Sequence, residues 1–213
     1  MDLEFLKREC AYIADSFTDE RIAGMEKVLA DRSNFFTVVL ENLYQPHNAS
    51  AMLRTCDCFG VQRAHIVNDK NEFLVQEKIA RGADQWVETY EHKSSETCIQ
   101  QLKDEGYLIA TTALEDYDYT LEEMPLNQKT AIVFGTEWNG TSDVAKKMAD
   151  IKVKVPMYGF TQSFNVSVSA AIILHHLNAK LRQSNISWRL TSQEETIARH
   201  YWYTKISEIR LKE

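Results

Sequence analysis

The sequence predicts an α/β protein: a parallel β-sheet with helices on both faces. Short runs of β-branched and aromatic residues alternate along the chain with stretches of helical spacing. Several of these runs are apolar without strict polar alternation, which is typical of parallel strands covered on both sides. The 213 residues, 44% of them apolar, suffice for one compact domain.

The first part of the chain, residues 1–34, is predicted to be a helical extension. Helical spacing is present over 3–14 and 19–31. Thr18 directly precedes the second stretch, and its hydroxyl is suited to cap a helix N-terminus.

The central part, residues 35–183, is predicted to hold the sheet. Five runs are expected to be strands: 36–42, 63–67, 107–111, 130–135 and 151–156. Four stretches are expected to be helices, near 48–58, 94–105, 141–149 and 164–182.

The last part, residues 184–213, is predicted to be a C-terminal helical extension. Thr191 and Glu194 have the spacing of a capping box, which marks a helix start. Four aromatic residues lie in or before this helix: Trp188, Tyr201, Trp202 and Tyr203. Such rings can stack on RNA bases, but docking of the helix or a dimer contact is the favoured interpretation.

Composition excludes several classes of protein. There is no run of about 18 uncharged apolar residues and no secretion signal at the start, so we expect a cytoplasmic protein without a membrane segment. The four cysteines are too few for a disulfide framework. Cys56 and Cys58 resemble half of a metal site, but no second pair follows at zinc-site spacing, so no metal is expected.

The charge pattern limits how the chain can bind nucleic acid. The net charge of −7 argues against general affinity for phosphate backbones. The charge is uneven, however, because residues 176–213 carry seven basic and four acidic side chains. Any contact with RNA must therefore rely on local basic patches.

The first of three notable segments, residues 42–60, follows the first predicted strand. Asn48 can cap the following helix, Arg54 lies on that helix, and Gly60 ends it. The alternative is that Asn48 is only a cap and that Arg54 is a surface residue, ion-paired with Asp57.

The other two segments also begin where predicted strands end, at the sheet edge where open α/β sheets bind ligands. In 132–143, Gly135 would allow a ligand to approach the backbone closely. In 155–177, small polar residues precede an apolar helix and could bind a ligand, or simply cap the helix. They are Ser163, Asn165, Ser167 and Ser169.

Taken together, the three segments resemble the motifs of the SpoU/TrmH family of RNA 2′-O-methyltransferases, which belongs to the SPOUT superfamily. The first has Asn48, Arg54 and a Phe-Gly pair, the second reads GxExxGxS, and the third reads SxNVSxSAA. Residues 20–32 and the terminal helix are similar to the TrmH branch, the tRNA (guanosine-18-2′-O)-methyltransferases. Gly24 departs from that branch, which has an arginine there.

The resemblance implies a C-terminal trefoil knot, a homodimer, and an enzyme that uses S-adenosylmethionine to methylate a ribose 2′-hydroxyl. The implied target is guanosine 18 in the D-loop of transfer RNA. Ribosomal RNA as the substrate is the first alternative, and a catalytically silent RNA-binding protein of the same fold is the second.

The resemblance also implies roles for individual residues. Arg54 would be catalytic, steadying the developing oxyanion or a phosphate, because arginine stays protonated and is a poor base. Asn48 and Glu137 would orient Arg54 or the substrate, and Ser163 and Asn165 would shape the site. Four residues would bind S-adenosylmethionine: Ala113, Gly135, Met157 and Val166. Two would contact RNA phosphate, unless they are ion-paired surface residues: Arg21 and Arg32.

Overall fold

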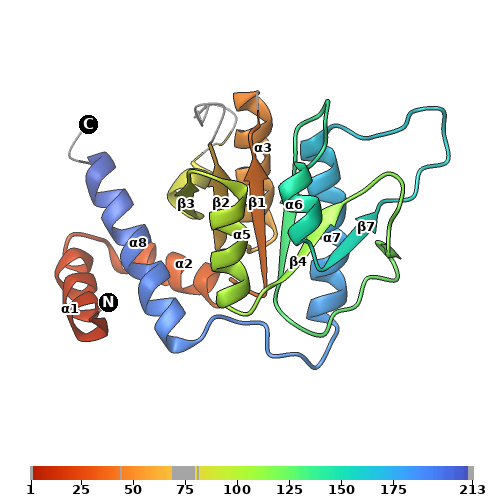
Figure 1. Ribbon diagram of the computed structural model, residues 1–213. Coiled ribbons are helices and arrows are strands. Elements are labelled where there is room, and N and C mark those ends of the chain that lie inside the picture. The colour runs from red at the N-terminus through yellow and green to blue at the C-terminus, as the bar shows by residue number, and fades with distance from the viewer. Residues whose placement is uncertain (1, 44, 69–79, 81, 211–213) are drawn as a thin grey trace.

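A computed structural model describes residues 2–43, 45–68, 80 and 82–210. Its strands are β1 (Phe36–Glu41), β2 (Arg63–Val67), β3 (Glu88–His92), β4 (Leu108–Thr112), β5 (Tyr119–Thr120), β6 (Thr130–Phe134) and β7 (Ile151–Lys154). They form one parallel sheet in the order β3-β2-β1-β6-β4-β7-β5. The predicted α/β class and parallel sheet are confirmed (Figure 1).

Helices cover both faces of this sheet, as predicted. The helices are α1 (Leu3–Ala14), α2 (Asp19–Leu29), α3 (Pro46–Cys58), α5 (Ser95–Asp104), α6 (Asp143–Met148), α7 (Val166–Arg182) and α8 (Ser192–Arg210), with a short 3-10 helix η1 (Ala83–Gln85). Val38 and Ile132 face α3 and α7, whereas their neighbours Val39 and Val133 face α5 and α6. Successive side chains of a strand point to opposite faces, so each strand contributes to two apolar layers.

All five predicted strands form, but β3 and β5 lie outside the prediction. Both are edge strands, each paired on one side only. The sequence of β3, ETYEH, is polar and only its first residue is buried, while β5 has two residues. An edge strand needs no continuous apolar run, so apolar patterning does not detect it.

The terminal helices α1, α2 and α8 lie together beside the sheet, at the end away from β7 (Figure 1). They share an apolar cluster in which Trp202 and Tyr203 are buried, with Tyr203 edge-on to Phe17 at 5.2 Å between ring centroids. These rings therefore dock α8, the interpretation that the sequence favoured. The predicted capping box also forms, because Thr191 and Glu194 each accept the other's backbone N–H.

Arg32 does not lie where an RNA phosphate could reach it, which corrects the sequence-based prediction. Its side chain is 1% exposed and pairs with Asp57 at 2.9 Å between Nη1 and Oδ1. It also donates to the backbone carbonyls of Asp57 and Trp86 and lies over the ring of Trp202. Arg32 thus links the N-terminal extension to three other parts of the chain: α3, α8 and the segment that follows η1. Sequence spacing gave no sign of these distant partners.

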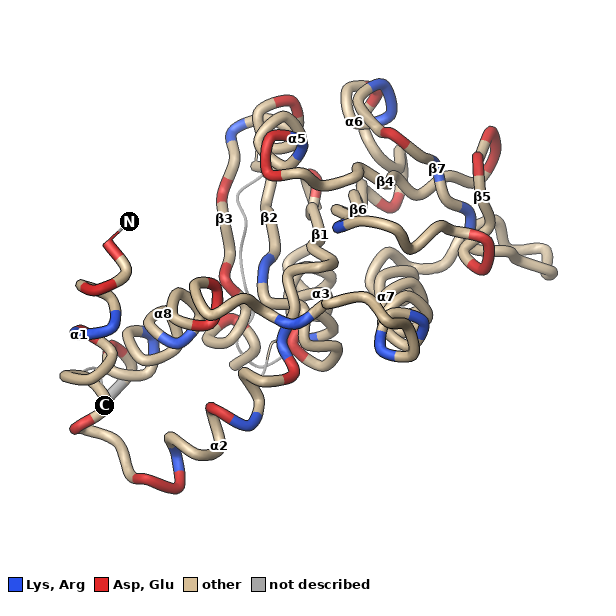
Figure 2. Tube along the Cα trace, turned by 90° about the horizontal axis from the view of Figure 1, so that it is seen from below, with Lys and Arg blue, Asp and Glu red and all other residues tan. Residues whose placement is uncertain are grey.

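Arg21, the other arginine expected to contact RNA, is exposed on α2 and lies over the ring of Phe17. Figure 2 shows basic and acidic residues interspersed along α1 and α2. None of the helices that the structure describes has both the length and the apolar content that a membrane crossing requires.

Candidate functional site

A cavity of about 680 Å³ opens at the carboxyl ends of β4, β6 and β7. This is the sheet edge where the sequence placed a ligand, and the volume falls within the range of about 300–1,000 Å³ common for small-molecule sites. Six of the predicted site residues line the cavity: Ala113, Gly135, Glu137, Met157, Ser163 and Val166.

Three polar side chains, one from each of the three segments, form a hydrogen-bonded cluster beside the cavity. Glu137 Oε1 accepts from Asn48 Nδ2 at 2.9 Å and from Asn165 Nδ2 at 2.6 Å. Asn165 also donates to Asn48 Oδ1, at 3.2 Å. The carboxylate of Glu137 therefore fixes both amides, and the fold brings together residues up to 117 positions apart.

Asn48 is not the helix cap that the sequence suggested. Gln45 occupies the N-cap position of α3, and Pro46 begins the helix, a position that suits the fixed φ angle of proline. Asn48 lies in the first turn and is 3% exposed. Its amide is therefore free to bind Glu137 and Asn165. Asn165 is the residue that caps, because its Oδ1 accepts the N–H of Ser167 at the start of α7.

Arg54 lies on α3, the helix that also carries Asn48, and is exposed. Within the described part of the chain, its side chain has no hydrogen bond or ion pair. The alternative pairing with Asp57 is wrong, because Asp57 pairs with Arg32. The Arg54 guanidinium, with its five N–H donors, is thus open to an external anion.

Gly135 is required for a reason that differs from the predicted one. A Cβ atom at this position would lie 2.0 Å from the backbone oxygen of Gly140. The chain folds back here, since Thr136 and Gly140 exchange two backbone hydrogen bonds of 2.9 Å. The close approach that glycine permits is therefore made by the protein's own loop, 135–142, which forms one wall of the cavity.

We expect Gly135→Ala to deform this loop and to weaken ligand binding in the cavity at least tenfold. Overpacking of a closed site typically costs about 1–3 kcal/mol of stability. Titration calorimetry with S-adenosylhomocysteine and urea unfolding measure the two effects. Gly24→Ala is the matched control, because a Cβ at Gly24 has no neighbour within 4 Å. A Gly135→Ala variant that matches wild type in both measurements would contradict the geometry.

Glu41 is a structural residue of the site that sequence reasoning missed. Its carboxylate is buried at the end of β1 and accepts from Ser142 N at 2.7 Å, from Ser142 Oγ and from Ser95 Oγ. Ser142 also caps α6. Glu41 therefore anchors the far end of loop 135–142 to the sheet and to α5. The sequence signal that could have identified Glu41 is an acidic residue at the end of an otherwise mostly apolar, buried strand.

Two threonines give the cavity wall unused hydrogen-bonding capacity. Thr111 and Thr141 line the cavity and are nearly fully buried. Their hydroxyl oxygens have no hydrogen-bond partner among the described residues. Buried polar groups are usually paired, so these hydroxyls suit a ligand with polar edges.

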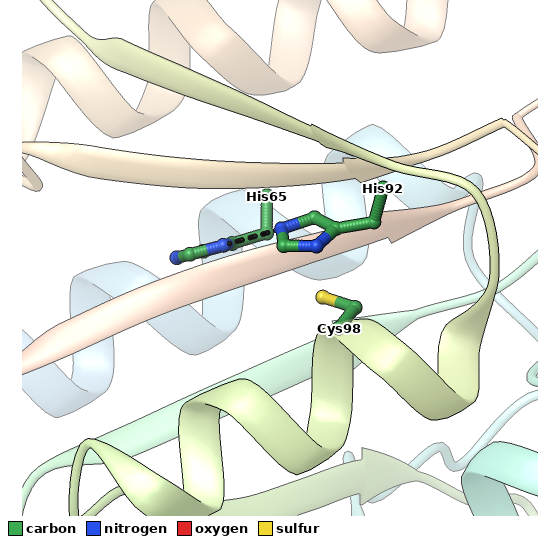
Figure 3. A group of neighbouring side chains, drawn as sticks. All are labelled: His65, His92 and Cys98. Carbon is green, nitrogen blue, oxygen red and sulfur yellow. Dashed lines mark hydrogen bonds between the residues drawn. The ribbon is translucent and has the colours of Figure 1, made fainter.

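A separate group of side chains comes together between the sheet and α5 (Figure 3): His65, His92 and Cys98. His65 and His92 lie on neighbouring strands and share a hydrogen bond of 3.0 Å between Nδ1 and Nε2. Burial raises the pKa of the Cys98 thiol to about 12. One imidazole donates to the other, and the tautomers of the two rings set the direction. Cys56 and Cys58 are both free thiols, Cys56 buried and Cys58 exposed.

The histidine pair predicts a pH dependence of stability. Burial, with a smaller effect of His92, lowers the pKa of His65 to about 3. The unfolded value is about 6.5, so below that pH the unfolded chain binds more protons than the folded chain. The stability contribution is present above pH 6.5 and is lost as the pH falls toward 3, at up to about 1.4 kcal/mol per unit.

Urea unfolding of wild type and His65→Gln between pH 7.5 and 5 measures this contribution. We expect a shallower decline of the free energy of unfolding in the variant. Equal slopes for the two proteins would contradict a neutral buried His65.

Comparison with known proteins places the chain in a family. Residues 36–175 match the SpoU rRNA Methylase family, and the chain belongs to it. It is 39% identical over 206 residues to the tRNA (guanosine(18)-2′-O)-methyltransferase of Borreliella burgdorferi, covering 97% of this chain and 94% of that protein. It is 40% identical over 157 residues to the enzyme of the same name from Thermus thermophilus, covering 74% and 81%. The fold is similar to the crystal structure of the A. aeolicus TrmH/SpoU tRNA modifying enzyme, with a TM-score of 0.81, 28% identity and coverage of 88% and 97%.

Proposed function

We propose that this protein is an S-adenosylmethionine-dependent methyltransferase that methylates the ribose 2′-hydroxyl of guanosine 18 in the D-loop of transfer RNA. The observation that carries the proposal is the Asn48–Glu137–Asn165 cluster beside the cavity. It joins all three family motifs at one place. The Borreliella and Thermus relatives, both named for this reaction, support the choice of substrate.

The residues of the cavity fit S-adenosylmethionine. The volume suits a ligand of that size, and the free hydroxyls of Thr111 and Thr141 can pair with its polar edges. We propose that it is held chiefly by four residues of the wall: Ala113, Gly135, Met157 and Val166. When bound, this group supplies an electrophilic methyl carbon.

The protein's own side chains then hold the nucleophile in place and stabilise its charge. Arg54 remains protonated, so it would donate hydrogen bonds to the developing 2′-oxyanion or to an adjacent phosphate. The 2′-hydroxyl proton would pass to that phosphate or to water as the O–C bond forms and the C–S bond breaks. Asn48 and Glu137, fixed by their mutual hydrogen bond, orient the substrate. Ser163 and Asn165 shape the site. Alignment of the oxygen with the methyl carbon is the main requirement of an in-line transfer.

The direct test is transfer of labelled methyl from S-adenosylmethionine to unmodified transfer RNA and, separately, to unmodified ribosomal RNA, with nuclease mapping of the product. We expect 2′-O-methylguanosine in the D-loop of transfer RNA. Labelling of ribosomal RNA alone would keep the chemistry and overturn the substrate. Absence of transfer, together with no thermal stabilisation by S-adenosylhomocysteine, would favour a silent RNA-binding protein.

We further propose a cytoplasmic homodimer. Large apolar side chains are exposed on the segment before α7 and on its first turn, which supports a contact between copies there. They are Tyr158, Phe160, Phe164 and Val168. Sedimentation at micromolar concentration is expected to give a dimer, and an active monomer would contradict it.

The same proposal includes two further features. One is the division of the chain into residues 1–34, 35–183 and 184–213, and the other is the trefoil knot. The separate apolar cluster of the terminal helices supports the division. The convergence of the connections after β4, β6 and β7 on one cavity is compatible with a knotted C-terminal half. An experimental trace of residues 108–182 tests the knot.

A further inference from the structure

Among the large apolar residues that line the cavity, Trp138 has the most exposed side chain. Its side chain is 87% exposed, yet it lines the same cavity as Gly135 and follows Glu137 directly. Single exposed apolar side chains are common on protein surfaces, but an exposed aromatic ring beside a ligand cavity offers an apolar face to whatever binds there. No feature of the reaction chemistry described above uses this ring.

The backbone that carries Trp138 is held on both sides. Thr136 and Gly140 exchange two backbone hydrogen bonds, and Asn139 N donates to Thr136 Oγ1 at 3.1 Å. Beyond Gly140, Ser142 is anchored to the buried carboxylate of Glu41. The ring is thus presented by a fixed loop, which limits the ordering entropy that a binding partner must offset.

We propose that Trp138 forms a stacking site for a nucleobase of the RNA substrate, at or next to the nucleotide that is methylated. The inference rests on the proposed function. If S-adenosylmethionine is held in the cavity, the ribose must approach the cavity to accept the methyl group, which would bring its base toward Trp138 in the cavity lining. Stacking of bases on aromatic side chains needs no cationic surface. Stacking can therefore contribute to RNA binding even though the net charge of the chain is −7.

Four proteins test the stacking site: wild type, Trp138→Ala, Trp138→Phe and Tyr12→Ala. Tyr12 is the matched control, a 77% exposed ring on α1. RNA affinity is measured by filter binding to unmodified transfer RNA, and cofactor-site integrity by titration with S-adenosylhomocysteine. We expect Trp138→Ala to weaken RNA binding about 10- to 100-fold, Trp138→Phe to retain most of the affinity, and Tyr12→Ala to match wild type. S-adenosylhomocysteine should bind Tyr12→Ala as it binds wild type, and Trp138→Ala should lose much more affinity for transfer RNA than for S-adenosylhomocysteine.

Two outcomes would overturn the stacking site. One is a Trp138→Ala variant that binds and methylates transfer RNA within twofold of wild type. The other is loss of RNA binding that accompanies dissociation of the dimer in sedimentation, which would make Trp138 a contact between copies. Failure of the proposed function is a separate result, because it is seen in wild type as the absence of methyl transfer to any RNA.

Discussion

The Arg54→Ala variant is expected to methylate transfer RNA about 10²- to 10³-fold more slowly than wild type in single turnovers. The reason is electrostatic: Arg54 is exposed and has no partner among the described residues, so its charge is available to the reacting oxygen or a neighbouring phosphate. Removal of one such donor from a preorganised site typically costs about 2.7–4 kcal/mol in the transition state. Rapid-quench assays with labelled S-adenosylmethionine measure the rate.

The unfolding midpoint and S-adenosylhomocysteine affinity of this variant should stay at wild-type values, because Arg54 contributes no described contact to the fold. Arg8→Ala, which removes an exposed arginine on α1, is the matched control and should react at the wild-type rate. Arg54→Lys keeps the charge but not the fork of donors, so we expect an intermediate rate. A rate for Arg54→Ala within tenfold of wild type would rule out the catalytic role.

The Arg32→Ala variant is expected to lose about 3 kcal/mol of stability, the lower end of the range for a broken buried ion pair. Burial lowers the pKa of Arg32, whereas the charge of Asp57 and its hydrogen bond raise it. The buried positive charge is therefore stabilised by this partner. Its removal leaves a cavity against Trp202 and takes one hydrogen bond from the Trp86 carbonyl. Asp57 remains about a third exposed, so water partly compensates its charge. Urea unfolding followed by circular dichroism measures the loss.

Arg21→Ala serves as the control for this experiment, because Arg21 is exposed and the one described contact of its side chain is with the ring of Phe17. We expect its stability within about 1 kcal/mol of wild type. The opposite pattern, with Arg32→Ala as stable as wild type but impaired in RNA binding, would restore the role in phosphate binding that the sequence first suggested.

Much of the fold followed from local pattern. The apolar runs at 36–42 and 130–135 are central strands, and a central parallel strand is buried on both faces, so its sequence alone reveals it. The edge strands β3 and β5 escaped detection because one side of each has no neighbouring strand. The capping signals at Thr18 and Thr191 were read correctly, because a cap depends on residues only three positions apart.

The candidate site shows the same difference between what local sequence indicates and what depends on distant contacts. By itself, the sequence identified Asn48, Glu137 and Asn165, one from each of three intact motifs, as residues that come together beside the cavity. Only the tertiary structure decided what each residue contacts. Asn48 binds Glu137 instead of capping its helix, Gly135 makes room for Gly140, and Arg32 is buried against Trp202. Each of these depends on a partner distant in sequence or on a loop closing on itself, and local periodicity carries no information on such contacts.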